Sequence, residues 1–181
     1  MSCRRLKPRS QLRMEAPTSF ANCLLVPALP DFHCQYPDIT IALSIIDRTI
    51  HVVGEGVDCA IRAGKLQDVA MVARKLAELR YATCASTAYL QRMAYAPPSS
   101  PENCQANHLH AGFFFFSATR RPESLILEKG SQHYEIDHCH FATNEGSGLI
   151  NLMLAGFGIG PHVRRFVQPY LDSGPPQNRY E

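Results

Sequence analysis

The sequence predicts an α/β fold built on a parallel sheet, and the order of short apolar runs in its first half supports this prediction. Runs of strand length lie at residues 12–16, 39–46 and 57–61, and a segment of helical spacing separates the first two. The run at 39–46 is almost continuously apolar, as expected for a strand that is covered on both faces. Strands that alternate with helices along the chain are typical of a parallel sheet.

Turn and cap residues predict the helices of the first half. Residues 17–19, Pro-Thr-Ser, follow the first strand and offer a hydroxyl as the N-cap of a helix. Pro27 and Pro30 predict a kink in that helix, or two abutting helices. A turn at 47–49 and a short helix at 50–55 are expected before the third strand. One face of the first helix carries apolar residues four apart: Phe20, Leu24, Ala28, Phe32 and Tyr36.

The second half is expected to add strands and helices around a proline-rich loop at 96–101. Four consecutive phenylalanines at 113–116 suit a strand that is buried on both faces. Gly130-Ser131 predicts the turn of a hairpin, and Gly156 is expected to end a helix. The predicted strands are 70–74, 79–85, 110–117, 125–129, 133–136, 141–143 and 157–160. The predicted helices begin at Ser86 and span 149–155 and 162–171.

Composition indicates an ordinary globular protein. The chain has 181 residues, of which 45% are hydrophobic and 19% are charged, which is enough for a sizeable core. No apolar run approaches the roughly 20 residues of a membrane-spanning helix, and no apolar signal core follows the basic N-terminus. Seven cysteines occur without a C-x-x-C pair, which argues against a disulfide framework and favours a reducing compartment. We therefore expect a cytoplasmic protein.

The net charge of +2 is dominated by the N-terminus. The remaining 13 basic and 16 acidic residues leave a net charge of −3, so the body of the chain shows no nucleic-acid footprint. We interpret residues 1–11 as a basic, linker-like leader. Five basic residues precede the first acid, Glu15: Arg4, Arg5, Lys7, Arg9 and Arg13.

Arg62 is the first candidate for ligand binding. It directly follows the strand at 57–61 and lies beside two small residues, Ala63 and Gly64. Ligands of open α/β sheets sit outside the carboxyl ends of the strands, and a lone arginine there suits a small anion. The alternative is that Arg62 caps a helix or pairs with an aspartate on the surface, and the sequence leaves both interpretations open.

Five motifs, in order along the chain, resemble the effector-binding (substrate-binding) domain of LysR-type transcriptional regulators. They are L-R-M-E-A-P-T-S-F-A at 12–21, L-P-D-F followed by Y-P-D-I within 29–39, V-G-E-G-V-D-C-A-I-R-A-G at 53–64, C-A-S-T-A-Y-L at 84–90 and A-G-F-G-I-G at 155–160. The resemblance covers about residues 10–174, and the order and spacing of the motifs make it specific.

The resemblance implies a fold like type 2 periplasmic binding proteins, in which two Rossmann-like α/β subdomains flank a cleft. The chain would cross between the subdomains twice, near Ala85 and near Gly160. Residues 12–84 plus 160–181 would then form the first subdomain, and residues 85–159 the second. In such regulators a small metabolite binds the cleft and alters how the oligomer holds DNA.

The resemblance also implies which residues line the cleft. Free N–H groups and the positive dipole end of a helix favour an anion, which agrees with residues placed where helices begin. Simple capping of a helix would, however, leave the same pattern. The expected ligand-binding residues are Thr18, Ser19, Asp47, Arg48, Arg62, Ser86, Phe115, Ser117, Asn144 and Glu145.

Two departures from the family pattern lead to two hypotheses. The sequence contains no winged helix-turn-helix, and it ends P-P-Q-N-R-Y-E where the family usually adds a strand and a tail. The first hypothesis is an effector-sensing domain that binds a small, anionic organic metabolite and forms a homodimer or higher homo-oligomer, without contacting nucleic acid or membrane. The alternative is a stand-alone, truncated module that pairs with full-length LysR-type regulators. A solute carrier is a third idea, against which the absence of a signal peptide argues.

Catalytic and metal sites find little support in the sequence. No G-x-S-x-G elbow, phosphate loop or dinucleotide fingerprint occurs, so we expect neither an enzyme nor a cofactor. His133, His138, Cys139 and His140 suggest a metal, but on a strand only His138 and His140 would share a face. Two ligands are too few for a structural zinc site, so we expect no metal.

Overall fold

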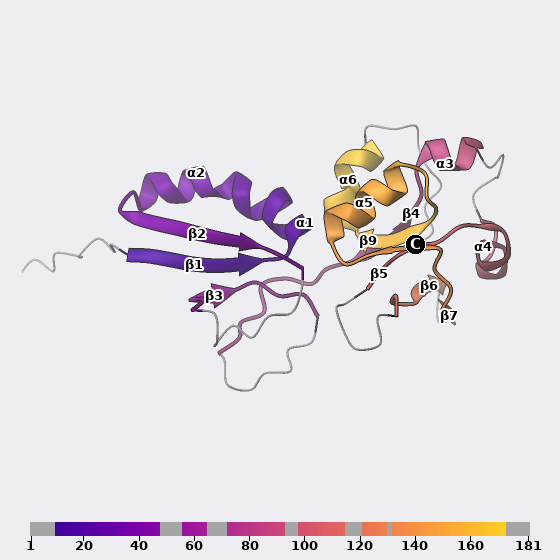
Figure 1. The fold of residues 1–181 in the computed structure, drawn as a ribbon, viewed down its shortest axis with the longest axis horizontal. Coiled ribbons are helices and arrows are strands. Elements are labelled where there is room, and N and C mark those ends of the chain that lie inside the picture. Colours follow the sequence, from indigo (N-terminus) through magenta and orange to yellow (C-terminus); the bar gives the residue numbers. More distant parts are fainter. Residues whose placement is uncertain are drawn as a thin grey trace, which may run out of the picture. The chain divides into compact units, whose positions relative to one another are not determined.

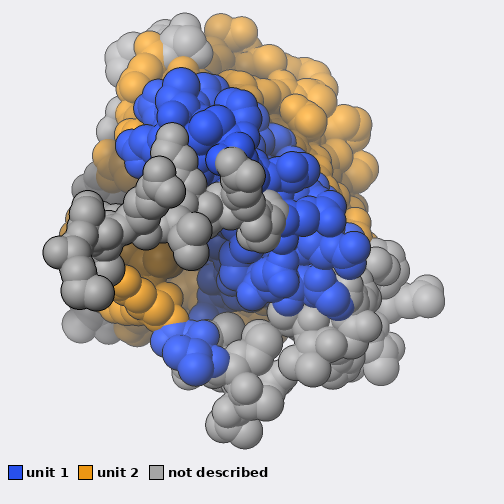
Figure 2. All heavy atoms as spheres, turned by 90° about the vertical axis from the view of Figure 1, so that its left-hand side faces the viewer, with its two compact units in different colours: residues 1–73 blue, residues 74–181 orange. Residues whose placement is uncertain are grey.

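The computed structural model describes residues 10–47, 56–64, 72–92, 98–114, 121–129 and 132–172. The chain divides into two compact units, Met1–Ala73 (unit 1) and Arg74–Glu181 (unit 2), which Figure 2 colours blue and orange. The mixture of strands and helices confirms the predicted α/β class. No helix in the described ranges is long and apolar enough to cross a membrane.

The described strands of unit 1 form the predicted parallel sheet, and their order in it is β2-β1-β3 (Figure 1). These strands are β1 Ser10–Ala16, β2 Ile39–Ile45 and β3 Cys59–Ala60. In the register of the sheet, Ala16 lies opposite Ile45, and Glu15 lies opposite Ala60. All three strands therefore end at the same edge.

The prediction that β2 is covered on both faces is wrong. Thr40, Ala42 and Ser44 are exposed, whereas Ile39, Ile41 and Leu43 are partly buried. The physical reason is an alternation in the sequence itself, since small or polar residues occupy every second position and a strand turns these to one face. Helix α2 lies along one face of the β1–β2 pair (Figure 1).

The connection between β1 and β2 is helical throughout, but it changes type. It consists of α1 Thr18–Phe20, a π-helical turn at Ala21–Leu25 and α2 Val26–Gln35. Pro27 is the second residue of α2, just after the π-helical turn, and Pro30 lies further inside α2. A proline lacks an N–H and its ring clashes with the carbonyl four residues earlier, so a wider turn before it relieves the clash. The predicted interruption takes this form.

The described strands of unit 2 form three pairs. Strand β4 Tyr81–Cys84 is antiparallel to β9 Gly160–Val163, and β5 Ala111–Phe113 is parallel to β8 Phe141–Thr143. Strands β6 Leu125–Lys129 and β7 Gln132–Ile136 form the predicted hairpin, whose turn residues 130–131 lie outside the described residues. The helices of unit 2 are α3 Thr87–Arg92, α4 Pro101–Asn107, α5 Gly146–Leu154 and α6 Arg164–Asp172.

Unit 2 holds most of the buried apolar residues. One cluster gathers around Tyr89, whose side chain is fully buried, and a second joins α5 to β5. The Tyr89 hydroxyl accepts from the Leu109 amide at 2.9 Å and lies 3.2 Å from His108 Nδ1, so this buried polar group is satisfied. The clusters comprise Tyr89, Cys104, Leu125, Ile136 and Ile159, and Ala111, Leu149 and Met153.

Several predicted boundaries shift. Residues 72–74, the described part of the strand predicted at 70–74, form no strand, and the strand predicted at 157–160 lies three residues later, in β9. Gly158 has φ 126°, and a Cβ there would overlap the carbonyl of Leu109, so the backbone turns before the strand begins. The helix predicted at 50–55 and the second half of the four-phenylalanine run, residues 115–116, lie outside the described residues.

The two predicted crossings lie side by side within unit 2. Cys84, next to the first crossing, pairs with Gly160 at the second, in the antiparallel β4–β9 pair. The assignment of residues 12–84 plus 160–181 and of residues 85–159 to two subdomains stays a prediction.

Candidate functional site

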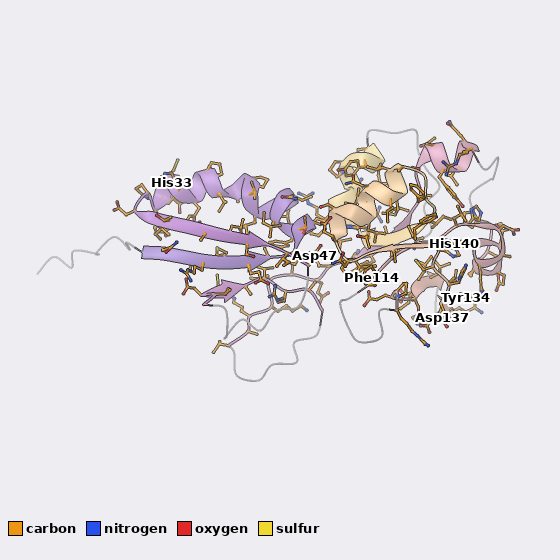
Figure 3. The ribbon with its side chains drawn as sticks, in the orientation of Figure 1. His33, Asp47, Phe114, Tyr134, Asp137 and His140 are labelled. Atoms are coloured by element: carbon orange, nitrogen blue, oxygen red, sulfur yellow. The ribbon has the colours of Figure 1, made fainter. Side chains whose placement is uncertain are left out.

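Four predicted ligand residues gather at the carboxyl edge of the sheet in unit 1. Thr18 and Ser19 follow β1, Asp47 follows β2 and Arg62 follows β3. Asp47 Oδ1 accepts from the Thr18 amide at 2.8 Å, which joins the ends of the first two strands. Figure 3 shows Asp47 beyond the arrowhead of β2. The edge of a parallel sheet thus brings together side chains that lie up to 44 positions apart in the sequence.

Backbone hydrogen bonds fix the chain around this edge. The Ile46 amide donates to the Ala16 carbonyl at 3.0 Å, and the Ile61 amide donates to the Glu15 carbonyl at 2.8 Å. Both bonds continue the strand pairing beyond the ends of the regular ladder. Asp47 and Arg62, each one residue further, therefore have defined starting positions for their side chains.

Arg62 forms an ion pair with Glu15. Its Nη2 donates to Glu15 Oε1, and the side chains are 18% and 1% exposed respectively. A buried carboxylate is costly without a partner, so the first role of Arg62 is to neutralise Glu15. The sequence left open that Arg62 pairs with a surface aspartate. Arg62 does pair with an acid, but the partner is a buried glutamate of β1. A guanidinium has five N–H donors, so donors remain for a ligand.

The expected hydroxyl cap of the first helix is wrong. The N-cap position is Pro17, without a side-chain cap bond, and Asp47 from the end of β2 takes the Thr18 amide instead. Ser19 is only 6% exposed, and its Oγ has no hydrogen-bond partner among the described residues. A buried hydroxyl left in this way costs about 1–3 kcal/mol, so a ligand atom or a water there would be favourable.

Two predicted residues of unit 2, Asn144 and Glu145, also lie at a helix N-terminus, but the Glu145 side chain already accepts the first amides of this helix. Glu145 is the N-cap of α5, and its carboxylate accepts from the amides of Ser147 at 2.8 Å and Gly148 at 2.6 Å. Asn144 precedes the cap and is partly buried. A Cβ at Gly148 would lie 3.2 Å from Glu145 Oε2 and 2.9 Å from Thr143 Oγ1, so glycine leaves room for the carboxylate.

Ser86, which was expected to bind the ligand, lies where the predicted helix begins and caps α3. Its Oγ accepts from the Tyr89 amide at 3.2 Å, at the start of α3. It also lines an apolar pocket of about 200 Å³ within unit 2, between the start of α3 and helices α5 and α6. The remaining predicted site residues, Arg48, Phe115 and Ser117, lie outside the described residues.

Sequence reasoning missed Glu15, the partner of Arg62. Part of the signal was present, since Glu15 is an acid one residue before the end of β1, next to the strand that precedes Arg62. An acid in such a strand needs a buried cation, and Arg62 was already expected at the same edge.

Of the histidines considered as metal ligands, His133 lies in β7, whereas His138 and His140 lie next to each other outside any strand. His138 and His140 follow the end of β7, and their ring centroids are 4.3 Å apart. Within the described ranges, no group of three or more histidine, cysteine, aspartate or glutamate side chains is placed to hold a metal ion.

The sequence matches the family model of the LysR substrate binding domain over residues 6–175. It is 30% identical over 170 residues to an HTH-type transcriptional repressor of Pseudomonas aeruginosa (strain UCBPP-PA14), covering 92% of this chain and 52% of that protein. It is 32% identical over 156 residues to the HTH-type transcriptional regulator CrgA of Neisseria meningitidis serogroup C, covering 84% of this chain and 49% of CrgA. The chain thus spans about half the length of these relatives.

Solved structures show the same fold. The regulatory domain of CrgA superimposes with a TM-score of 0.76 at 26% identity, over 92% of this chain and 79% of that domain. The regulatory domain of an AphB variant from Vibrio vulnificus superimposes with a TM-score of 0.72 at 19% identity, over 91% of this chain and 79% of that domain, which supports the fold alone. The chain therefore belongs to the LysR substrate-binding domain family, the effector-binding domains of LysR-type transcriptional regulators.

Proposed function

We propose that this chain senses a small, anionic organic metabolite for a LysR-type transcriptional regulator, and that the metabolite binds at the carboxyl edge of the β2-β1-β3 sheet. One observation carries the proposal. Ser19, whose hydroxyl is buried and lacks a partner among the described residues, lies at the same sheet edge as Thr18 and Arg62. Ligands of open parallel sheets bind at this edge.

The charges at the edge favour binding of an anion by side chains over binding by helix N-termini. Asp47 takes the Thr18 amide, and Glu145 takes the first amides of α5, so neither helix start offers these N–H groups freely. Arg62 is held by Glu15, which orients the guanidinium while leaving it other donors. We propose that Arg62 and the hydroxyls of Thr18 and Ser19 receive the carboxylate of the effector, rather than the helix dipoles.

Screening by thermal stability can find the effector. An acid that binds only the folded state stabilises it by about 2.7 kcal/mol at one hundred times its Kd. Affinities of each hit would then be compared in Ser19→Ala and in the double variant Glu15→Gln/Arg62→Gln. The double variant removes the cation without leaving Glu15 as an unpaired buried charge.

Arg13→Gln is the matched control, because Arg13 lies in β1, is exposed and carries the same charge. We expect a tenfold or greater loss of affinity in the double variant and little change in the control. An acid that binds the folded double variant as tightly as the wild type would refute the role of Arg62.

We also propose that the domain acts in the cytoplasm as part of a homodimer or higher homo-oligomer, in which the bound effector alters DNA binding by the full regulator. The alternative, a module that pairs with full-length LysR-type regulators, is favoured by the exposed apolar surface of unit 1. No residue of α2 is buried, and Val26 is 41% and Tyr36 39% exposed. Sedimentation separates the two cases when the chain is measured alone and then mixed with a full-length relative. A chain that stays monomeric in both samples would rule out the pairing module.

A further inference from the structure

Three histidines meet at the start of β5. His110 immediately precedes this strand, and His138 and His140 lie in the segment that leads into β8 (His140 is labelled in Figure 3). The His140 ring is 5.9 Å from the His110 ring and 4.3 Å from the His138 ring, centroid to centroid. The effector proposal uses none of these groups.

Backbone and ring atoms join His110 to His140 in both directions. The His140 amide donates to the His110 carbonyl at 2.9 Å, and the His110 amide donates to His140 Nδ1 at 3.1 Å. These two bonds clasp the 138–140 segment to the chain just before β5. The clasp continues into the parallel pairing of Ala111 with Phe141.

The partners assign the protons of the rings. A backbone amide can only donate, so His140 Nδ1 carries a lone pair and neutral His140 has its proton on Nε2. His138 Nε2 lies 3.3 Å from His140 Nε2 and must accept that proton's hydrogen bond. His110 Nε2 lies 3.1 Å from the Cys104 carbonyl, which can only accept, so His110 also has its proton on Nε2.

This assignment argues against a metal bridging His138 and His140. A metal binds the unprotonated nitrogen of a neutral imidazole. Binding at His140 Nε2 would move the proton to Nδ1, where it would face the donating His110 amide. The pair is therefore arranged for a hydrogen bond rather than for coordination.

Adding a proton breaks the same arrangement. A proton on His140 Nδ1 would face the His110 N–H, and a proton on His138 Nε2 would face the His140 N–H. Burial, together with the charge of His138, lowers the pKa of His140. Burial is also the main cause that lowers the pKa of His110, against smaller opposing effects of the Cys104 and His138 backbones, and the charges of His140 and His138 lower it further.

We propose that His110, His138 and His140 form an acid-sensitive clasp that holds the 138–140 segment against the start of β5 and opens when the His140 imidazole gains a proton. Strand β8 follows the clasp directly and leads into Asn144 and Glu145, so opening would loosen the strand that positions the N-terminus of α5. The clasp would make this part of unit 2 respond to pH independently of the effector.

The other titratable groups around the clasp do not reverse the expected opening at low pH. Cys104 of α4 lies 3.6 Å from His110 Nε2, and the Cys139 thiol lies 3.7 Å from the His110 carbonyl. Burial raises the pKa of both thiols, so both stay neutral in the range where imidazoles titrate. The adjacent acid Asp137 accepts from the Ser124 hydroxyl at 2.7 Å.

The sign of the pH dependence follows from these pKa directions. His110 and His140 have lowered pKa values in the folded state, so an opened state binds more protons than the closed one. The closed clasp is then fully favoured above the ordinary histidine pKa of about 6.5 and is lost progressively as the pH falls below it. One coupled proton raises the opening constant by up to about tenfold per pH unit.

Hydrogen exchange of the His110 amide, corrected for the intrinsic rate, measures this opening between pH 7.5 and 5.5. The wild-type chain should lose protection as the pH falls. In His140→Asn the loss should be clearly smaller, because the asparagine Oδ1 can accept from the His110 amide but does not titrate, whereas His110 still does. His133→Gln, at an exposed histidine of β7 outside the clasp, should keep the wild-type dependence.

Nitrogen NMR of the histidine rings in the wild-type chain gives a second readout that needs no variant. It should show the proton of neutral His140 on Nε2. A proton on Nδ1 would overturn the proposal, as would equal pH dependence in the wild type and in His140→Asn. Zinc binding by the wild type that is lost in His138→Gln would show a metal pair instead and would also overturn it.

Discussion

Removing Arg62 alone should destabilise the chain far more than removing Arg62 together with Glu15. Glu15 is 1% exposed, so Arg62→Gln leaves a carboxylate buried without its cation. Breaking a buried pair from one side costs about 3–5 kcal/mol, whereas replacing both charges is often close to neutral. The second substitution, Glu15→Gln, should therefore recover most of the loss.

Urea unfolding followed by circular dichroism provides the assay, with the midpoint and slope compared across the series. The series is the wild type, Arg62→Gln, Glu15→Gln/Arg62→Gln and the exposed control Arg13→Gln, which should shift stability by less than about 0.5 kcal/mol. An Arg62→Gln variant as stable as the control would refute the account of the pair. So would a double variant no more stable than Arg62→Gln, because the stranded charge would then not be the cause.

Three further predictions concern unit 2. Glu145→Ala removes the N-cap of α5 and should cost about 1 kcal/mol in chemical unfolding; an unchanged midpoint would contradict the cap. Gly158→Ala should prevent stable folding of unit 2, because its φ is 126° and a Cβ would overlap the Leu109 carbonyl; a native circular dichroism spectrum would contradict this. Burial raises the pKa of Cys104 to about 11, so alkylation at pH 8 should label exposed Cys34 first and reach Cys104 only after unfolding.

The parallel sheet and the edge that carries the proposed site could be predicted because the sheet follows from local patterns. Apolar runs of strand length that alternate with helical spacing predict parallel pairing, and parallel strands bring their carboxyl ends to one edge. Arg62 could therefore be placed at this edge from the pattern, whereas Thr18 and Asp47 were expected there from the family resemblance. A local pattern also predicted the hairpin of β6 and β7, because Gly130-Ser131 separates two short runs of strand length in the sequence.

The partners of these residues could not be predicted, because they are set by distances across the fold. Asp47 takes the Thr18 amide from 29 positions away, and Glu15 meets Arg62 from 47 positions away. A capping hydroxyl in the sequence gives no indication that a distant carboxylate already fills the cap. The late start of β9 likewise depends on the close approach of Gly158 to Leu109, which local propensity does not contain.

The proposed effector site can be tested most directly by mapping a bound acid by NMR. Amide shifts of the 181-residue chain would be followed while an acid from the stability screen is titrated in. The account predicts that the largest shifts fall on Thr18, Ser19, Asp47 and Arg62, and that Ser19→Ala weakens them at equal ligand concentration. Saturable shifts confined to the apolar pocket beside Ser86, with the sheet edge of unit 1 unmoved, would contradict it.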